Sequence, residues 1–191
     1  MNTKDSFKKT WRFIWHDDSW ASWFVNIIIA FILVKFLIYP GLGFILGTTH
    51  PVVAVISGSM EHEVQGFDYW WLVNKDLYKY FDIKKSDFEN YKFKTGFNKG
   101  DLMILTRSGE IKKGDVIVFW GSVSEPIIHR VVRVSNGTYQ TKGDNGKTNK
   151  FSRFDEKEIT PDKIVGKAVI RVPYLGWAKL AFVELINKIF H

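Results

Sequence analysis

The central structural feature of this sequence is the stretch Val52-Val-Ala-Val-Ile-Ser-Gly-Ser-Met60. A run of β-branched residues is typical of a buried strand. The strand leads into a small, flexible turn, which brings the hydroxyls of Ser57 and Ser59 close to a backbone N–H. We therefore predict a strand that delivers a candidate nucleophile at its end.

Five further runs of strand-forming residues follow this turn, at 102–105, 116–120, 127–134, 139–142 and 164–172. Two of them open with a Gly-Asp pair, at Gly100 and Gly114, which is typical of a turn before a strand. The spacing of these turns predicts a compact, mostly antiparallel β fold. We expect this mainly β domain to occupy residues 47–175.

Residues 61–99 interrupt the series of strands with a segment rich in aromatic and charged residues, including Tyr69-Trp-Trp71 and Leu77-Tyr-Lys-Tyr-Phe81. We interpret this segment as an insertion between the nucleophile turn and the next strand. Its aromatic side chains would either enter a membrane interface, where such residues gather, or pack on the domain. Both interpretations remain open at this point.

An apolar stretch precedes the β domain, from Trp20 to Tyr39 and onward to Leu46. About 20 residues at 1.5 Å each cross a hydrocarbon core of about 30 Å. Pro40-Gly41 is expected to break or kink the helix. A cleaved signal peptide is the alternative, but its apolar region is shorter and ends at an Ala-x-Ala-like site, which is missing here. We predict an uncleaved transmembrane anchor over residues 20–46.

The distribution of basic residues predicts the orientation of this anchor. Four precede it, Lys4, Lys8, Lys9 and Arg12, whereas no Lys or Arg occurs at positions 36–74. By the positive-inside rule, residues 1–19 are a cytoplasmic segment and the β domain is extracytoplasmic. We expect a single-pass protein of the cell membrane.

The last segment, residues 176–191, carries apolar residues at helical spacing on one side and Lys179, Glu184, Asn187 and Lys188 on the other. We predict an amphipathic C-terminal helix, too short to span a bilayer. It would lie either in the membrane interface or against the domain. Proximity to the anchor favours the interface.

The composition narrows the classes of partner. The 191 residues include no cysteine, which excludes disulfides, a thiol nucleophile and thiolate metal ligands. The formal charge of +7 suits anionic lipid or nucleic acid. Aromatic residues make up 16% of the chain, with 8 Trp, which favours a lipid surface. Because the basic residues are dispersed and the domain lies outside the membrane, we expect no nucleic-acid partner.

A serine hydroxyl is a poor nucleophile without a base and a group that orients the base. His129 is the best candidate base, because its ordinary pKa of about 6.5 lies near working pH. Asp144, in the turn Lys142-Gly-Asp-Asn-Gly146, would orient it. The Ser59 N–H and the Ser57 hydroxyl would form the oxyanion hole. A structural His129 and an Asp144 that only organises a hairpin turn are the plainer alternatives. No His/Glu spacing indicates a metal site, and no cofactor is expected.

Four motifs, in this order along the chain, are similar to the sequence boxes of type I signal peptidases. They are Ser57-Gly-Ser-Met60, Gly114-Asp-Val-Ile-Val-Phe119, Ile128-His-Arg-Val-Val132 and Thr141-Lys-Gly-Asp-Asn145. The resemblance is closest to the archaeal enzymes and to the catalytic subunit of the eukaryotic endoplasmic-reticulum complex, which use serine and histidine. It extends from the anchor through Trp177.

This resemblance implies a membrane-anchored serine endopeptidase that removes signal peptides from secretory preproteins after small residues. It implies Ser59 as the nucleophile, His129 as the base, Ser57 and the Ser59 N–H as oxyanion donors, and accessory subunits as candidate partners. The alternative from a different class is a catalytically inactive, membrane-tethered binding module on the same fold.

Two positions depart from the family pattern. His62 stands where the family often has proline, and Lys150 stands where many relatives carry a second aspartate. We therefore expect Asp144 to take the catalytic role of the acid, with Asp155 as the alternative supplied by a longer loop.

Overall fold

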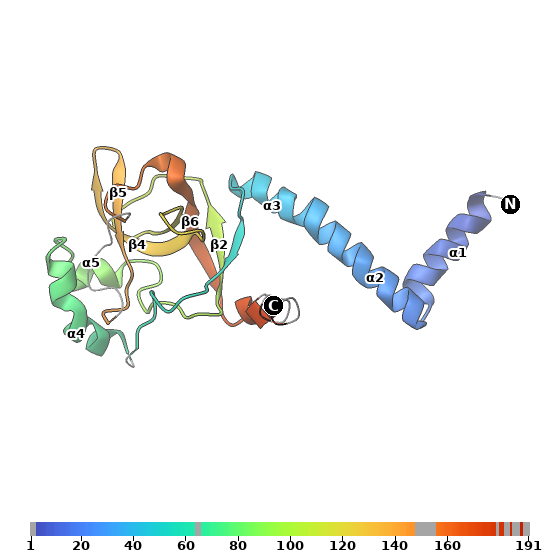
Figure 1. The fold of residues 1–191 in the computed structure, drawn as a ribbon, viewed down its shortest axis with the longest axis horizontal. Coiled ribbons are helices and arrows are strands. Elements are labelled where there is room, and N and C mark those ends of the chain that lie inside the picture. The colour runs from blue at the N-terminus through green and yellow to red at the C-terminus, as the bar shows by residue number, and fades with distance from the viewer. Residues whose placement is uncertain are drawn as a thin grey trace. The chain divides into compact units, whose positions relative to one another are not determined.

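The computed structural model describes residues 3–63, 66–147 and 156–178, together with 180, 181, 184 and 188. The chain forms two compact units, Met1–Ile45 and Leu46–His191. The first contains helices only, and the second contains the sheet (Figure 1).

The second unit is built on a six-stranded sheet in the order β1-β2-β6-β3-β4-β5, with every neighbouring pair antiparallel. The strands are β1 (Val52–Ala54), β2 (Leu102–Thr106), β3 (Val116–Phe119), β4 (Ile127–Ser135), β5 (Thr138–Lys142) and β6 (Ile164–Val172). The predicted mainly β, antiparallel fold is confirmed, and each strand overlaps a predicted run.

The side chains of β3 alternate between two core clusters, as expected for a strand buried on both faces. Val116 and Val118 join a cluster that includes Met60, next to the nucleophile turn. Ile117 and Phe119 join a second cluster with Val131 of β4. The turn and β4 are thus held to the same central strand.

The insertion contains two helices, α4 (Phe67–Lys79) and α5 (Lys85–Glu89). They pack beside β4 and β5 in Figure 1 and form a third core cluster. Trp70, Tyr78 and Phe88 are fully buried there. Of the two interpretations, packing on the domain therefore holds for these aromatic residues. Several others on the insertion stay exposed: Tyr69, Leu72, Val73 and Tyr80.

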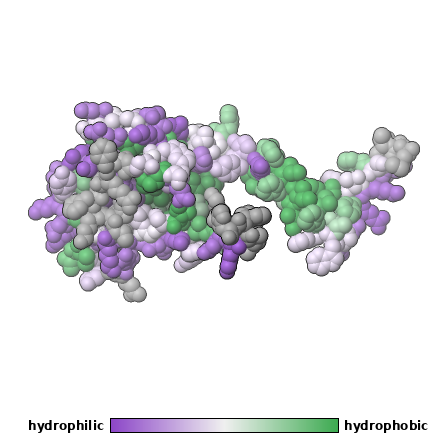
Figure 2. Space-filling model, viewed as in Figure 1, coloured by the Kyte–Doolittle hydropathy of each residue, from purple (hydrophilic) through white to green (hydrophobic). Residues whose placement is uncertain are grey.

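The first unit contains α1 (Thr3–His16) and a continuous helix made of α2 (Trp20–Leu33), a π turn η1 (Val34–Ile38) and α3 (Tyr39–Leu46). Within the described residues, the helix Trp20–Leu46 is the one that is long and apolar enough to cross a membrane. Hydrophobic side chains cover it in Figure 2.

Of the break or kink expected at Pro40, the break does not occur, because the helix continues to Leu46. Proline removes an N–H donor, and its ring clashes with the carbonyl four residues earlier. Here a π turn directly precedes it, and the Tyr39 N–H reaches back five residues to the Val34 carbonyl. This wider turn accommodates the proline ring, as π-bulges do in other helices.

A short helix η3 (Pro161–Lys163) leads into β6. The predicted amphipathic helix at 176–191 lies largely outside the described residues, and so does Asp155.

Candidate active site

The Ser-Gly-Ser turn leaves β1 between two buried side chains, Val55 and Met60. The hydroxyls of Ser57 and Ser59 lie 3.2 Å apart. Asn145, which follows β5, fixes the turn. Its N–H donates to the Ser59 carbonyl at 2.9 Å, and its side-chain amide donates to the Gly58 carbonyl at 3.0 Å. Asn145 therefore holds the backbone of the turn at two carbonyls, while Ser57 stays exposed and Ser59 half-buried.

His129 lies in β4, opposite Ile117 of β3, and is buried. Its Nδ1 contacts the carboxylate of Glu156, which is also buried. A carboxylate at Nδ1 holds the proton on that nitrogen, and this leaves Nε2 as the acceptor. The same arrangement orients the histidine of Ser-His-Asp triads. The His129–Glu156 pair is thus built like the base and orienting acid of a serine hydrolase.

The contact expected between Asp144 and His129 is absent from the described part of the chain. Asp144 instead binds Arg130, which donates to it through Nε at 3.0 and 3.1 Å and through Nη2 at 2.6 Å. The Tyr78 hydroxyl donates to it at 2.8 Å. The physical reason is strand geometry. Successive residues of a strand point to opposite faces, and the register pairs Arg130, not His129, with Lys142.

The electrostatics of this second site follow from burial. Burial by itself raises the pKa of Asp144, but the charge and hydrogen bonds of Arg130, together with His62, outweigh it and hold the pKa below its ordinary value. Burial also raises the pKa of the Tyr78 hydroxyl well above 10, and the Asp144 charge adds to this. Asp144 is therefore ionised and Tyr78 neutral at physiological pH.

Lys142 lies beside this pair and is fully buried. Its ammonium donates to the Gly143 carbonyl at 2.6 Å and lies 4.9 Å from the centre of the Tyr78 ring. Burial lowers its pKa to about 8, although the charges of Asp144 and Glu156 act in the opposite direction.

His62, at the position where the family often has proline, stacks on Trp70 with the ring centres 3.7 Å apart. Its Nε2 lies 3.7 Å from an Asp144 oxygen. It therefore joins the insertion to the Asp144 cluster rather than facing His129.

In the part of the chain that the structure describes, no hydrogen bond joins Ser59 to His129. Such bonds are often long or unformed without substrate and tighten only in the complex. The roles of Ser59, His129 and the oxyanion donors therefore remain predictions. The described residues contain no group of three or more metal-binding side chains.

Sequence reasoning did not consider Glu156, which contacts His129, and it assigned the role of the acid to Asp144, which follows β5 and contacts Arg130. Which acid acts in catalysis stays a prediction. Asp155, the alternative acid predicted to be supplied by a longer loop, lies outside the described residues. No residue pattern singles out Glu156, because the path of a loop decides which of its side chains reaches a buried histidine.

Together, the antiparallel β domain, the serine turn and the buried His129–Glu156 pair resemble the arrangement found in serine hydrolases. No family model matches the chain. The chain is 28% identical over 161 residues to "Signal peptidase complex catalytic subunit SEC11" of Komagataella phaffii, covering 78% of this chain and 76% of the relative.

Two further relatives bear the same name. The identity is 26% over 158 residues in Scheffersomyces stipitis, covering 78% and 75% of the two chains. It is 25% over 166 residues in Clavispora lusitaniae, covering 82% and 80%. The predicted resemblance is confirmed: the chain is a homologue of signal peptidase catalytic subunits.

Proposed function

We propose that this protein is a membrane-anchored serine endopeptidase that removes N-terminal signal peptides from secretory preproteins, cleaving after small residues. The observation that carries the proposal is the buried His129–Glu156 pair, in a chain that is homologous over 78% of its length to a signal peptidase catalytic subunit.

In the proposed mechanism, the Ser59 hydroxyl oxygen attacks the scissile carbonyl carbon while Nε2 of His129 takes the hydroxyl proton. Glu156 holds the Nδ1–H and stabilises the imidazolium that forms. The imidazolium then gives its proton to the leaving amine, which departs as the new N-terminus. Water, activated by the same histidine, hydrolyses the acyl-enzyme and restores Ser59.

The negative oxygen of each tetrahedral intermediate needs preorganised donors. The Ser59 backbone N–H and the Ser57 hydroxyl are the candidates. The 3.2 Å separation of the two hydroxyls places Ser57 next to the nucleophile. The Asn145 bonds to the turn hold its backbone in one conformation, so that the donors need no rearrangement during the reaction.

The preprotein's scissile bond would lie just outside the bilayer, which suits a domain tethered by a helix at Trp20–Leu46. We propose a cell-membrane location with a cytoplasmic N-terminus, on the basis of the basic residues before the span. The relatives are named as subunits of a complex, so accessory subunits are proposed partners of this chain as well.

The decisive experiment measures cleavage of a test preprotein with an Ala-x-Ala site by the full-length protein in liposomes. We expect Ser59→Ala to reduce cleavage by at least about 10³-fold, because it removes the nucleophile. Ser108→Ala is the matched control, since Ser108 is exposed and distant in sequence from the turn.

Cleavage retained by folded Ser59→Ala would contradict the proposal. If the folded wild type does not cut, a serine-reactive acylating probe separates the remaining explanations. Labelling of Ser59 indicates an intact enzyme that lacks a partner subunit, whereas an unlabelled Ser59 overturns the catalytic proposal.

A further inference from the structure

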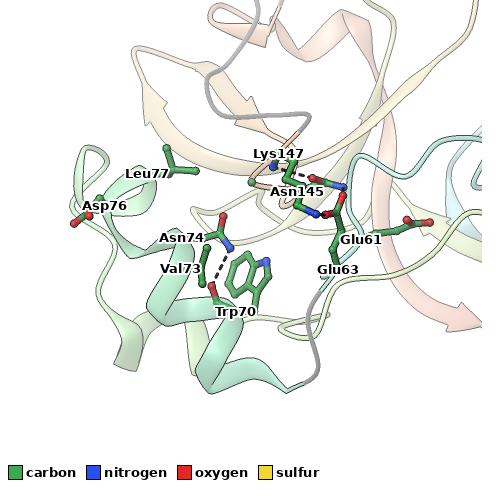
Figure 3. A pocket seen from close by; sticks show the side chains of 10 residues that line it. Glu61, Glu63, Trp70, Val73, Asn74, Asp76, Leu77, Asn145 and Lys147 are labelled. Carbon is green, nitrogen blue, oxygen red and sulfur yellow. Dashed lines mark hydrogen bonds and ion pairs between the residues drawn. The ribbon is translucent and has the colours of Figure 1, made fainter.

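A cavity of about 420 Å³ lies between α4 and two segments near the candidate active site, residues 61–63 and residues 145–147. Figure 3 shows its lining. Trp70, Val73 and Leu77 form an apolar wall on α4. Polar side chains from the segments 61–63 and 145–147 lie opposite. Neither the fold nor the proposed catalytic steps account for this cavity.

The cavity adjoins the nucleophile turn. Glu61 lines it and is only two residues beyond Ser59. Asn145 also lines it, and the same side-chain amide donates both to the Gly58 carbonyl of the turn and to Glu63, at 3.0 Å each. Gly146 lies so close to Asn74 of α4 that a Cβ there would collide with the amide. The insertion is thus fitted closely against the turn and forms one side of the cavity.

Carboxylates outnumber cationic groups among the charged side chains that line the cavity. Three carboxylates line the cavity, from Glu61, Glu63 and Asp76, against the single ammonium of Lys147. Lys147 pairs with Glu63, and Glu61 accepts the Lys99 N–H at 2.9 Å. Among the described residues, Asp76 forms no ion pair. A cavity lined by one sign of charge attracts a ligand group of the opposite sign.

Trp70 supplies an independent indication of a ligand. Its side chain is 1% exposed, and its Nε1–H has no hydrogen-bond acceptor in the described part of the protein. In Figure 3 the ring nitrogen is turned toward the side of the cavity where Glu63 and Asn145 lie. A buried donor left unpaired costs about 1–3 kcal/mol. A carbonyl oxygen that enters the cavity would accept from this donor.

We propose that this cavity is a substrate subsite for a lysine or arginine side chain of the preprotein close to the scissile bond. The aliphatic stem packs on Val73 and Leu77, as long cationic side chains do on apolar surfaces. The charged end lies toward Asp76, which forms no ion pair among the described residues, and a substrate carbonyl accepts from Trp70 Nε1. The inference rests on the proposed function and adds a specificity determinant contributed by the insertion.

The test compares preproteins that differ at one residue. Lys, Gln or Glu is placed at each position flanking the scissile bond in turn, and kcat/KM is measured with the full-length protein in uncharged phosphatidylcholine liposomes. We expect one position at which Lys is preferred over Gln by about three- to tenfold, the range of a modest ion pair combined with packing. Glu at that position is expected to be the poorest substrate.

Matched variants assign the preference to the cavity. Val73→Trp fills the space and is expected to abolish the preference for Lys, while Leu72→Trp is the control, because Leu72 is equally exposed on α4 but does not line the cavity. Asp76→Asn is expected to reduce the preference, and Asp68→Asn on the same helix is expected to preserve it. Equal effects in a variant and its control, or no preferred position in the wild type, would overturn the proposal.

Binding separates this proposal from the proposed function. Fluorescently labelled Lys and Gln peptides are titrated onto full-length Ser59→Ala, which cannot turn them over, with and without Val73→Trp. A preference for the Lys peptide that Val73→Trp removes supports the subsite even if the wild type proves unable to cleave. Cleavage without any charge preference, in both kinetics and binding, overturns the subsite and leaves the peptidase proposal intact.

Discussion

His129 and Arg130 are adjacent in β4 and both buried, yet they lie in very different environments. Arg130 uses all five of its N–H groups, on Asp144 and on the carbonyls of Lys92, Phe93 and Gly114. The only hydrogen bond described for the His129 ring is at Nδ1, to Glu156. A side chain whose donors are all satisfied inside the protein has none left for a substrate.

The comparison separates two roles on one strand, a structural role at Arg130 and the role that we propose for His129. Arg130 also lies over the Phe88 ring, with its guanidinium carbon 4.6 Å from the ring centre, so it links β4 to the insertion as well as to Asp144. The Arg130 face therefore holds the domain together. The His129 face is the one we propose to be catalytic. The sharpest test of this division replaces each contacting carboxylate with its amide: Glu156, which contacts His129, and Asp144, which contacts Arg130.

Glu156→Gln is expected to have the largest effect on activity. The amide keeps the shape of the side chain but favours the wrong tautomer of His129, and such a change in a catalytic triad costs about 10⁴ in kcat. Stability should change by little more than about 1 kcal/mol. Cleavage kinetics in liposomes and thermal unfolding of the same preparation measure both effects. Unchanged kcat would assign His129–Glu156 a purely structural role.

Asp144→Asn is expected to have the opposite pattern. It leaves the guanidinium of Arg130 buried without its counter-charge, and breaking a buried ion pair in this way costs about 3–5 kcal/mol. Denaturant unfolding of the full-length protein in detergent, followed by tryptophan fluorescence, measures the loss.

The double variant Asp144→Asn, Arg130→Met removes both charges and should recover part of the stability, whereas Asp68→Asn, an exposed control, should lose almost none. If Asp144→Asn instead stays stable but loses activity as severely as Glu156→Gln, the division between the two faces of β4 is wrong.

The smallest expected effect comes from Lys142, which lies opposite Arg130 in the β4–β5 register. Its pKa is lowered from 10.5 to about 8 in the folded protein, chiefly by burial. Between pH 8 and 10.5 the unfolded chain therefore binds more protons at this site, so the free energy of unfolding rises with pH, by about 2–3 kcal/mol in total.

Lys142→Met should remove this rise and be more stable than the wild type at pH 7. Unfolding titrations of the two proteins at pH 7, 8, 9 and 10 provide the measurement. Parallel pH profiles for wild type and variant would contradict a lowered pKa of Lys142 in the folded protein.

The strands were predictable because their signals are local. Runs of β-branched residues are separated by turn pairs such as Gly100-Asp101 and Gly114-Asp115. Local preference and tertiary packing therefore favour the same strands. The helix α4 was not predicted, because its aromatic residues pack mainly against one another and against Phe88 of α5 rather than forming a simple amphipathic stripe. Continuation of the helix through Pro40 depends on a π turn, and no residue pattern specifies such a turn.

The candidate site was predictable only in part. Ser57, Ser59 and His129 stand in short motifs that define their own local structure. The acid that contacts His129 depends on strand register and on a loop path, which are properties of the folded chain. The sequence pattern placed an acid in the turn at Asp144, and the fold uses that acid to neutralise Arg130.

The length of the helix Trp20–Leu46, the candidate span, determines which bilayer thickness it would match. Its 27 residues rise about 40 Å, roughly 10 Å more than a typical hydrocarbon core. In a thin bilayer the helix must tilt or bend to bury its apolar length, and each ångström of mismatch carries an energetic cost. The anchor is therefore better matched to thick bilayers, and hydrophobic mismatch alone would sort this protein toward them.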